Sequence, residues 1–378
     1  MSLDIVADEN IAEAAEYFGE LGTVRLLGGR QLQRSDLTGA DVLLVRSVTS
    51  VNESLLAGTA VKFVGTATSG FDHIDRIYLE EKGISFAHAP GSNANSVVEY
   101  VLSAIASVDD KLECLLNGGS IGIIGYGNIG KMLAGRLIAL GLSCKVYDPW
   151  LEQENIHNSA SLDEVLQCDV ISVHAELTRK NPWPSYHLIG EAELAQLVEG
   201  ALLINASRGP VVDNIALESY LRKEHGATIV LDAWENEPVV GEALLSRVRF
   251  GTAHIAGYSL DGKLLATQML KNALSQHLNI SVPNCNRNKP GATIFVAGNP
   301  CGADLLRTLL LHYYDIAEDD HMLREAITGQ SKDNSAAAFD QLRKSYRNRI
   351  ELYGSSVHVT LDNPADVRII EAMGCKLA

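Results

Sequence analysis

The sequence lacks the features that mark several large classes of protein. Its six cysteines are scattered over 378 residues with no C-x-x-C pair, so neither a disulfide scaffold nor a metal site is expected. No apolar run approaches the roughly 20 residues that a membrane-spanning helix needs. The first 20 residues carry several acids and no basic leader segment. We therefore expect a cytoplasmic protein with reduced thiols and no contact with a membrane.

Positive charge is also scarce. The chain has 31 Lys and Arg against 47 Asp and Glu, a formal net charge of −16, and its one basic run is short, from Arg343 to Arg349. This balance argues against nucleic acid or an anionic membrane as the main partner. A small anion can still bind where local arginines or helix N-termini receive it. We expect the basic run itself to be a solvated helix face.

One stretch organises the chain, because an apolar run at 120–124 opens onto glycines spaced G-x-G-x-x-G. Gly125 would allow a sharp turn, Gly127 would let a pyrophosphate approach, and Gly130 would let a helix pack closely on the sheet. Asn128 and Ile129 would begin that helix, whose N-terminal N–H groups favour phosphate. The spacing alone is a weak signal, since ordinary turns also use glycine.

The sequence context strengthens the signal. A second apolar run, 145–147, ends in Asp148, which lies 18 residues after Gly130. A carboxylate there can bind the ribose 2′-hydroxyl of NAD and would repel the 2′-phosphate of NADP. The alternative is a surface aspartate in an Asp-Pro turn. The order of strand, glycines, helix, strand and acid favours NAD as the cofactor.

Apolar runs and helical patterns alternate along most of the chain, which predicts an α/β fold. A flavodoxin-like α/β substrate (lid) domain with a parallel sheet is expected from 1–91 and 258–285. A doubly wound parallel-sheet NAD domain is expected between them, at 92–257, because its strands are continuously apolar. Within it, residues 92–117 are expected to form one long helix.

The rest of the chain, 286–378, is expected to be a C-terminal α+β dimerisation domain reached through a linker at Pro283–Pro290. Its leucine-rich helix, 303–314, has more apolar surface than a small peripheral domain easily buries alone. This suggests a homodimer, with an ordinary core helix as the alternative.

Three polar residues follow successive strands of the predicted NAD domain: Arg208, Glu237 and His254. Each has an ordinary reading alone, as a surface charge, a turn residue and a loop histidine. Together at the cofactor edge they suit hydride transfer from a hydroxy acid. The guanidinium can hold a carboxylate, the imidazole can accept the hydroxyl proton, and the glutamate can fix the imidazole tautomer.

The order of glycine loop, Asp148, Asn-Ala-Ser-Arg-Gly, Asp-x-x-x-x-Glu-Pro and His-Ile-Ala-Gly resembles the D-isomer-specific 2-hydroxyacid dehydrogenases, from residue 1 to about 280. The resemblance implies that Arg208 binds the substrate carboxylate, that Glu237 orients His254, and that His254 is the acid/base. The stretches 45–49, 65–70 and 254–258 are similar to members of this family that act on a phosphorylated hydroxy acid of four carbons.

The resemblance also implies individual contacts. Residues matching Ser47, Thr68 and Tyr258 contact the substrate, and those matching Asp148, Ala206, Ser207, Arg208, Asp232 and Gly257 contact NAD. Among the substrate loops, Arg46 is the cation that could offset a phosphate dianion. The basic run 343–349 could supply a second cation if a partner subunit lends its C-terminal domain to the site, although we expect a solvated helix face there. After His174 the family commonly has a hydroxyl residue and a proline, whereas this chain has Ala175 and Glu176. Any cofactor contact at Ala175 must therefore come from the backbone.

Two alternatives remain open. One is a dehydrogenase for 3-phosphoglycerate, which is one carbon shorter, or for another D-2-hydroxy acid. Such enzymes can carry a strand-rich regulatory domain, whereas this C-terminal region shows one clear strand. The other is a non-catalytic NAD-sensing corepressor, which could retain the same three polar residues. NADH production from a hydroxy acid would separate enzyme from sensor.

Overall fold

The computed structural model describes residues 2–223, 226–280 and 291–378. The chain divides into two compact units, which are described separately. Unit 1 comprises Met1–Asn93 and Ser259–Lys289, and unit 2 comprises Ala94–Tyr258 and Pro290–Ala378. The linker predicted at Pro283–Pro290 lies outside the described residues. Within the described part, no helix is long and apolar enough to cross a membrane.

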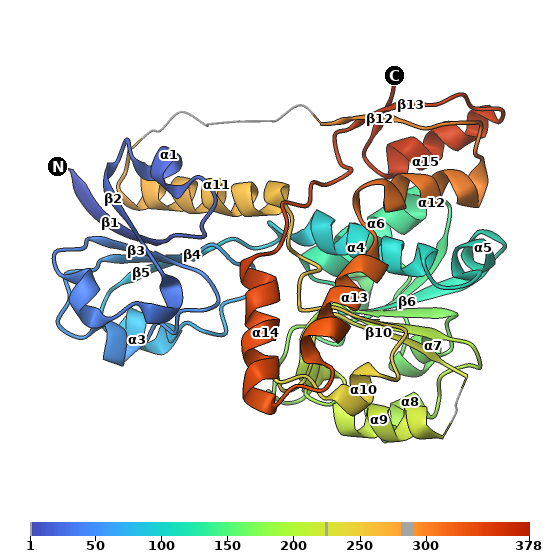
Figure 1. Ribbon diagram of the computed structural model, residues 1–378, viewed down its shortest axis with the longest axis horizontal. Coiled ribbons are helices and arrows are strands. Elements are labelled where there is room, and N and C mark those ends of the chain that lie inside the picture. Colours follow the sequence, from blue (N-terminus) through green and yellow to red (C-terminus); the bar gives the residue numbers. More distant parts are fainter. Residues whose placement is uncertain (1, 224–225, 281–290) are drawn as a thin grey trace. The chain divides into compact units, whose positions relative to one another are not determined.

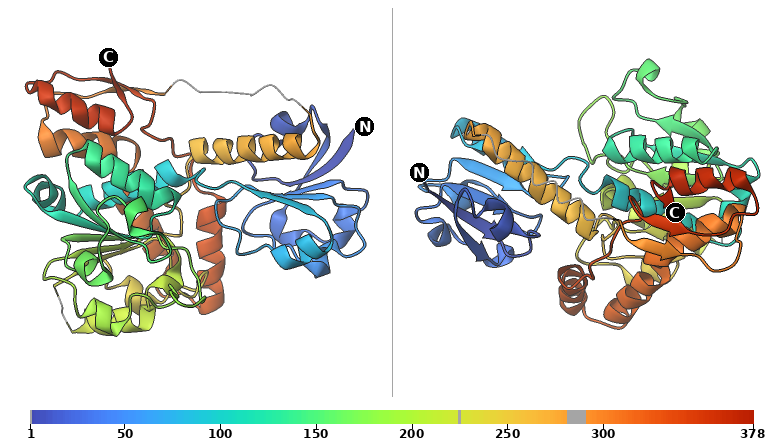
Figure 2. Two further views of the ribbon diagram at one scale, coloured as in Figure 1. Left: turned by 180° about the vertical axis from the view of Figure 1, so that it is seen from behind. Right: turned by 90° about the horizontal axis from the view of Figure 1, so that it is seen from above.

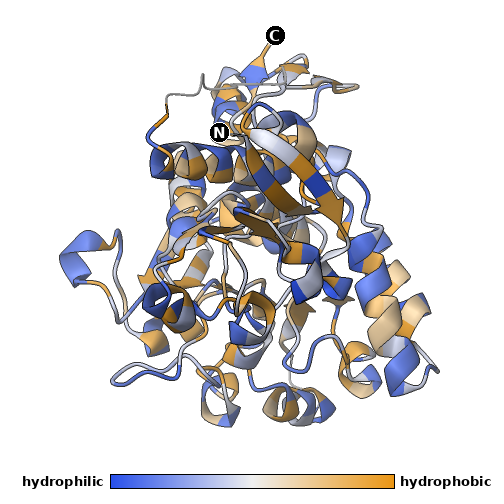
Figure 3. Ribbon diagram, turned by 90° about the vertical axis from the view of Figure 1, so that its left-hand side faces the viewer, coloured by the Kyte–Doolittle hydropathy of each residue, from blue (hydrophilic) through white to orange (hydrophobic). Residues whose placement is uncertain are grey.

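Unit 1 is built on a five-stranded parallel sheet in the order β2-β1-β3-β4-β5, the flavodoxin-like order that the sequence predicted. Its strands are β1 (Leu3–Asp8), β2 (Gly22–Leu27), β3 (Val42–Val45), β4 (Phe63–Thr66) and β5 (Ser85–His88). β3 and β4 are buried along their whole length, as strands of a covered parallel sheet must be. Figure 3 shows hydrophobic residues along the strands of this unit.

Four helices cover this sheet: α1 (Ala14–Phe18), α2 (Glu53–Leu56), α3 (Arg76–Glu81) and the 18-residue α11 (Leu260–His277). α11 comes from far along the chain and packs against β4, β5 and α1, as Figure 2 shows. Its Leu270 and Leu274 are fully buried beside Ile5 and Phe63. Unit 1 is therefore discontinuous in sequence.

Unit 2 contains a six-stranded parallel sheet in the order β11-β10-β9-β8-β6-β7. Its strands are β6 (Ser120–Ile124), β7 (Ser143–Tyr147), β8 (Val170–Val173), β9 (Leu202–Asn205), β10 (Thr228–Leu231) and β11 (Phe250–Gly251). An isolated parallel bridge between Val146 and Ser159 continues the sheet beyond β7. The predicted α/β fold class with a doubly wound sheet is confirmed.

The helices of this layer are α4 (Ala94–Ala106), α5 (Lys111–Leu116), α6 (Asn128–Ala139), α7 (Leu162–Leu166), α8 (Glu191–Leu194), α9 (Asn214–Arg222) and α10 (Glu242–Leu245). The single helix expected at 92–117 was wrong, because α4 and α5 are separate. Asp109 between them has a φ of 39°, in the left-handed region, where a helix cannot continue. The Ser107 hydroxyl bonds back to the Ser103 carbonyl at 2.8 Å, a local contact that competes with helix hydrogen bonding.

The C-terminal region of unit 2 has four helices and a three-stranded parallel sheet. It is coloured orange to red in Figure 1. The helices are α12 (Gly302–Tyr313), α13 (Ile316–Ile327), α14 (Lys332–Lys344) and α15 (Val367–Ala372). The strands are β12 (Thr293–Phe295), β13 (Ser356–His358) and β14 (Lys376–Leu377). β12 and β14 were not predicted, because strands of three and two residues are too short to show a pattern.

The leucine-rich helix α12 is a core helix of unit 2. Leu305, Leu306, Leu309 and Leu310 are buried, and α12 packs against α4 and α15. These leucines join the same core as the strands of the six-stranded sheet. They therefore give no support for a second subunit, and the ordinary core-helix alternative describes them.

Candidate active site

The glycine loop between β6 and α6 has the geometry that a dinucleotide requires. Gly125 has a φ of 96°, and a Cβ there would lie 2.6 Å from the backbone nitrogen of Ala175. A Cβ on Gly130 would lie 2.0 Å from the carbonyl oxygen of Gly125. In contrast, a Cβ on Gly127 would meet nothing within 4 Å, so the backbone is open where a pyrophosphate would approach. Asn128 begins α6.

Asp148 and Ala175 lie at this loop, beyond the ends of β7 and β8, the two strands that flank β6. The Asp148 carboxylate accepts the Tyr126 backbone N–H at 2.8 Å and the Trp150 backbone N–H at 3.0 Å. The acid therefore sits beside the residue between the first two glycines, as a ribose-binding carboxylate should. Ala175 reaches the loop through its backbone, in contact with Gly125.

Arg208 follows β9 in a loop that its own neighbours hold in place. The Asn205 side chain donates to the Arg208 carbonyl at 3.1 Å and accepts from the Ser207 backbone and hydroxyl at 3.1 and 2.8 Å. Gly209 approaches the Trp234 carbonyl so closely that a Cβ would lie 1.9 Å from its oxygen. The loops after β9 and β10 are thus packed together, with Ala206 and Ser207 buried between them.

Glu237 and His254 form a direct hydrogen bond. His254 Nδ1 lies 2.7 Å from Glu237 Oε2, while Glu237 Oε1 accepts the Trp234 backbone N–H at 2.7 Å. Burial acts to raise the pKa of Glu237, but attraction to His254 and Arg343 and its hydrogen bonds outweigh burial and hold the pKa below 4.5. An ionised Glu237 keeps the proton on Nδ1 and turns Nε2 into the acceptor.

Asp232, expected to contact NAD, is buried and organises the histidine loop. Its Oδ1 accepts the Ile255 N–H at 2.7 Å and the Thr252 hydroxyl at 2.6 Å, and its Oδ2 accepts the Ala256 N–H at 3.0 Å. These bonds fix the backbone on both sides of His254, whose φ is 54°. Gly257 follows directly. This bracing role could not be predicted from the sequence, because it depends on contacts between residues 20 to 24 positions apart.

A buried charge network from the C-terminal region supports the same loop. Arg349 Nη2 donates to the Ala256 carbonyl at 2.6 Å and to the Ser96 carbonyl at 3.0 Å. Its guanidinium lies 4.5 Å from the centre of the Tyr314 ring. Arg349 is buried, which contradicts the expectation that the basic run is a solvated helix face. The sequence shows the basic run, but the spacing of its residues cannot identify the partners of Arg349.

Glu99 on α4 binds the backbone of the segment that follows Arg349. Its carboxylate accepts the Leu352 backbone N–H at 2.9 Å and the Asn95 side-chain amide at 2.9 Å. Burial, reinforced by the nearby Glu351 carboxylate, raises the pKa of Glu99 from 4.5 to about 7. Glu99 is therefore a buried titratable group that joins α4 to the C-terminal region.

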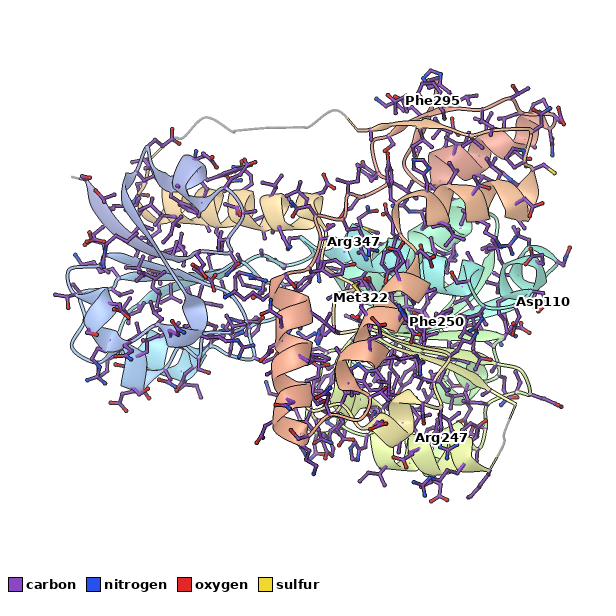
Figure 4. The ribbon with its side chains drawn as sticks, in the orientation of Figure 1. Asp110, Arg247, Phe250, Phe295, Met322 and Arg347 are labelled. Atoms are coloured by element: carbon purple, nitrogen blue, oxygen red, sulfur yellow. The ribbon has the colours of Figure 1, made fainter. Side chains whose placement is uncertain are left out.

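Tyr258, a predicted substrate contact, also meets the C-terminal region. Its hydroxyl oxygen accepts a hydrogen bond from Arg343 Nη2 at 3.0 Å, and its ring packs edge-on against Tyr346 at 5.9 Å. Arg347, the next arginine of the run, is labelled in Figure 4 and donates instead to Glu318 at 2.9 Å. The three arginines of the basic run thus have different partners: Tyr258 for Arg343, Glu318 for Arg347 and the Ala256 carbonyl for Arg349.

The other predicted substrate contacts lie in unit 1, at the carboxyl edge of its sheet. Arg46 and Ser47 follow β3, and Thr68 follows the neighbouring β4. The Thr68 hydroxyl donates to the Gly70 carbonyl at 2.7 Å and lies 2.7 Å from the Thr66 hydroxyl. Ser47 is exposed and Arg46 is half-buried. Strand ends of an open α/β sheet are the usual place for ligands.

Two histidines of unit 2 were not singled out in the sequence. Burial lowers the pKa of His174 from 6.5 to about 3, so its ring is neutral, with Nε2 2.8 Å from the Ser172 hydroxyl. His187 lies 2.6 Å from a Glu235 oxygen and 3.5 Å from an Asp213 oxygen. The ligand atoms of His187, Asp213 and Glu235 lie within 4.8 Å of one another.

Comparison with known protein families agrees with this geometry. Residues 104–256 match the family described as D-isomer specific 2-hydroxyacid dehydrogenase, NAD binding domain. Residues 292–374 match a domain of unknown function (DUF3410). The glycine loop, Asp148, Arg208, Glu237 and His254 all lie in the first match.

Solved structures share the fold. The structure of 3-phosphoglycerate dehydrogenase from Entamoeba histolytica with bound NAD+ has a TM-score of 0.63 at 22% identity, covering 76% of this chain and 99% of its own. D-lactate dehydrogenase from Aquifex aeolicus, with NAD and lactic acid, has a TM-score of 0.59 at 24% identity, covering 73% and 95%.

Relatives with higher identity cover nearly the whole chain. Erythronate-4-phosphate dehydrogenase of Cellvibrio japonicus is 44% identical over 98% of this chain and 99% of its own length. The enzymes of the same name from Teredinibacter turnerae and Stutzerimonas stutzeri are 42% and 41% identical, covering 92% and 99% of this chain and 93% and 100% of their own. The predicted family is confirmed. The chain belongs to the erythronate-4-phosphate dehydrogenases within the D-isomer specific 2-hydroxyacid dehydrogenase family.

Proposed function

We propose that this chain oxidises 4-phospho-D-erythronate at C2 with NAD, giving (R)-3-hydroxy-2-oxo-4-phosphobutanoate for pyridoxal 5′-phosphate biosynthesis. The observation that carries the proposal is the His254–Glu237 hydrogen bond of 2.7 Å, which prepares Nε2 to accept a proton. Near-full-length identity to erythronate-4-phosphate dehydrogenases supports the choice of substrate.

The catalytic residues we propose are Arg208, Glu237 and His254. The Arg208 guanidinium binds the substrate carboxylate through its planar fork and polarises the oxygen at C2. His254 Nε2 accepts the C2 hydroxyl proton while the hydride leaves C2, so the C–O bond becomes a carbonyl. Ionised Glu237 stabilises the imidazolium that results. When bound, NAD supplies the acceptor for that hydride.

The residues of the NAD domain suit this cofactor. Gly125, Gly127, Asn128, Ile129 and Gly130 would hold the pyrophosphate, because the loop is open at Gly127 and α6 begins there. We propose that Asp148 binds the adenosine ribose. Further contacts are proposed from Ala206, Ser207, Arg208, Asp232 and Gly257, and from the backbone of Ala175.

The substrate contacts that we propose are Arg46, Ser47, Thr68 and Tyr258. Arg46, Ser47 and Thr68 belong to unit 1, and Tyr258 belongs to unit 2. The hydroxyls can bond the substrate hydroxyls and the phosphate, and Arg46 can offset part of the phosphate charge.

We further propose a cytoplasmic homodimer formed through the C-terminal region, residues 286–378, with 1–91 and 258–285 as substrate domain and 92–257 as NAD domain. The outer face of the three-stranded sheet supports a second copy as partner. Phe295 on β12 is 73% exposed and stacks on His358 at 4.7 Å (Figure 4). β12 and β14 are both edge strands, which can pair with another chain.

The test is NADH formation, followed by absorbance, from a panel of hydroxy acids with the purified full-length protein. We expect 4-phospho-D-erythronate to exceed D-erythronate and 3-phospho-D-glycerate in kcat/KM, each at least tenfold. A preference for 3-phosphoglycerate would favour that alternative. Absence of turnover with every acid, together with measurable NAD binding, would favour a sensor over an enzyme.

A further inference from the structure

Helix α14 presents Arg343 to Tyr258. Phe339 and Arg343 are four residues apart and lie on one face of the helix, where Phe339 is fully buried. The Arg343 guanidinium carbon lies 5.6 Å from the centre of the Tyr258 ring and 6.0 Å from that of Phe339. One donor, Nη2, bonds the Tyr258 hydroxyl at 3.0 Å. Tyr258 in turn lies four residues after His254.

The charge of Arg343 is not neutralised by contact with an acid. Among the residues that the structure describes, no carboxylate lies within ion-pair distance of its guanidinium. In contrast, Arg347 contacts Glu318 at 2.9 Å and Asp319 at 3.4 Å. Arg343 Nε is shielded from solvent and has no hydrogen-bond partner in the described chain. A guanidinium N–H that is shielded from water and has no acceptor is costly unless an anion completes it.

The positive charge of Arg343 acts on the proposed catalytic pair, Glu237 and His254. Arg343 is among the groups that lower the pKa of Glu237, so its positive charge acts on the Glu237–His254 pair. Burial acts to lower the pKa of Arg343, but Tyr258 and Glu237 outweigh burial and raise it above its ordinary value. Arg343 therefore stays charged beside the site at any pH at which the enzyme works.

The chemistry of the substrate calls for such a cation. In 4-phospho-D-erythronate the phosphorus is four bonds from C2, an extended distance of roughly 5 Å. When His254 acts at C2, the phosphate must therefore lie within several ångströms of the His254 ring. A phosphate monoester carries about −1.5 to −2 charges at neutral pH, and a planar guanidinium fork is the side chain best suited to bind it.

We propose that Arg343 binds the phosphate group of the substrate and that Tyr258 holds its fork in place. The inference rests on the proposed function and adds a specificity-determining residue from the C-terminal domain. It assigns the domain of unknown function a direct part in substrate binding, in the same chain as the catalytic residues.

A merely structural role would give a different result. If Arg343 only braces Tyr258 or tunes Glu237, its loss would affect phosphorylated and unphosphorylated substrates alike. It would then appear mainly in kcat and in the pH profile. If Arg343 binds phosphate, its loss raises KM for the phosphorylated acid alone.

The experiment compares Arg343→Gln and Arg343→Lys with Lys344→Gln, a control that removes one charge from the neighbouring exposed position. Kinetics are measured with 4-phospho-D-erythronate and with D-erythronate. Binding of inorganic phosphate in the presence of NADH is measured by titration calorimetry. We expect Arg343→Gln to raise KM for the phosphorylated acid about 10- to 100-fold and to weaken phosphate binding by a similar factor. KM for D-erythronate should change less than threefold.

Arg343→Lys should give a KM and a phosphate affinity between those of the wild type and Arg343→Gln, because lysine keeps the charge without the planar fork. Lys344→Gln should match the wild type in both. If Arg343→Gln does not fold, Arg343→Lys decides by the same two measurements. An unchanged substrate preference together with unchanged phosphate binding would overturn the inference. If the wild type does not oxidise 4-phospho-D-erythronate, the proposed function fails. Loss of phosphate binding in Arg343→Gln would still establish the anion site, and retained binding would overturn it.

Discussion

Arg349 donates a hydrogen bond of 2.6 Å to the carbonyl oxygen of Ala256, two residues beyond His254. This bond joins the C-terminal region to the loop that carries the proposed catalytic base. Asp232 holds the same loop from the sheet side, through the N–H groups of Ile255 and Ala256. The position of His254 thus depends on two buried side chains: Asp232, which directly follows β10, and Arg349, from the C-terminal region.

Replacing Arg349 with Met should destabilise the protein and impair catalysis. The substitution leaves the Ser96 and Ala256 carbonyls without their donor in a buried place, which should lower the free energy of unfolding by about 2–4 kcal/mol. Loosening of the loop should lower kcat at least tenfold while NAD binding is kept. Urea unfolding and steady-state kinetics measure the two effects. Arg347→Gln is the matched control, because Arg347 is partly exposed and its ion pairs should contribute less than about 1 kcal/mol. Equal effects of the two substitutions would contradict the bracing role.

His254→Ala and Glu237→Gln should separate the base from its partner. Loss of the base should reduce kcat by about 10²–10⁴-fold with NAD affinity retained. In Glu237→Gln the lost negative charge makes protonation of the imidazole less favourable. The acid limb of the kcat/KM profile should therefore move to lower pH, with a smaller loss of rate. Wild-type turnover in His254→Ala, or an unshifted acid limb in Glu237→Gln, would refute these roles.

Asp148→Gly should relax the choice of cofactor. NAD should bind more weakly by about 1–3 kcal/mol, because a hydrogen bond to the ribose is lost. The variant should also discriminate less against NADP, since the repulsion of the 2′-phosphate disappears. Fluorescence titration with both dinucleotides measures the ratio. An Asp148→Gly protein that keeps the full preference for NAD would show that Asp148 only fixes the turn at Trp150.

Glu99 should make stability depend on pH. Because burial raises its pKa from 4.5 to about 7 in the folded protein, the protonated form is favoured by folding. That contribution is fully present below pH 4.5 and is lost as the pH rises through 7, at a total cost of about 3 kcal/mol. Glu99→Gln cannot ionise, so the difference in unfolding free energy between variant and wild type should grow by this amount from pH 4.5 to 7.5. A constant difference would contradict the assignment.

Phe295→Asp should dissociate the proposed dimer without unfolding the chain. Phe295 is 73% exposed on the outer face of the small sheet, so its loss should not disturb the core, whereas a charge there should oppose pairing. Light scattering should show a dimeric wild type and a monomeric variant. Ile77→Asp is the control, because Ile77 is 72% exposed on α3. A dimeric Phe295→Asp protein, or a monomeric wild type, would exclude this interface.

The parts of the fold that the sequence predicted are those with strong local patterns. Val170–Val173 and Thr228–Leu231 are strands at the predicted residues, because a short, mostly apolar run without polar alternation marks a covered parallel strand. The break at Asp109 was missed, since it depends on a single left-handed residue. The strands β12 and β14 were missed because three and two residues are too few to show a hydrophobic periodicity.

The candidate site shows the same division. Its glycine loop and strand-end residues follow from topology, which brings the carboxyl ends of parallel strands to one edge. The roles of Asp232, Glu99 and Arg349 depend on partners far away in sequence, such as the 253 positions between Ser96 and Arg349. Likewise, spacing could indicate a basic run but could not show that Arg343 meets Tyr258 while Arg349 meets Ala256.

The most direct measurement of the central claim is the transfer of the hydrogen at C2. 4-Phospho-D-erythronate carrying deuterium at C2 is incubated with NAD and the enzyme, and the NADH is analysed by mass spectrometry. We predict NADH with one added deuterium, formed together with the 2-oxo acid in equal amount, and the same transfer about 10²–10⁴-fold slower with His254→Ala. NADH without deuterium, or no NADH at all from this substrate, would contradict the proposed reaction.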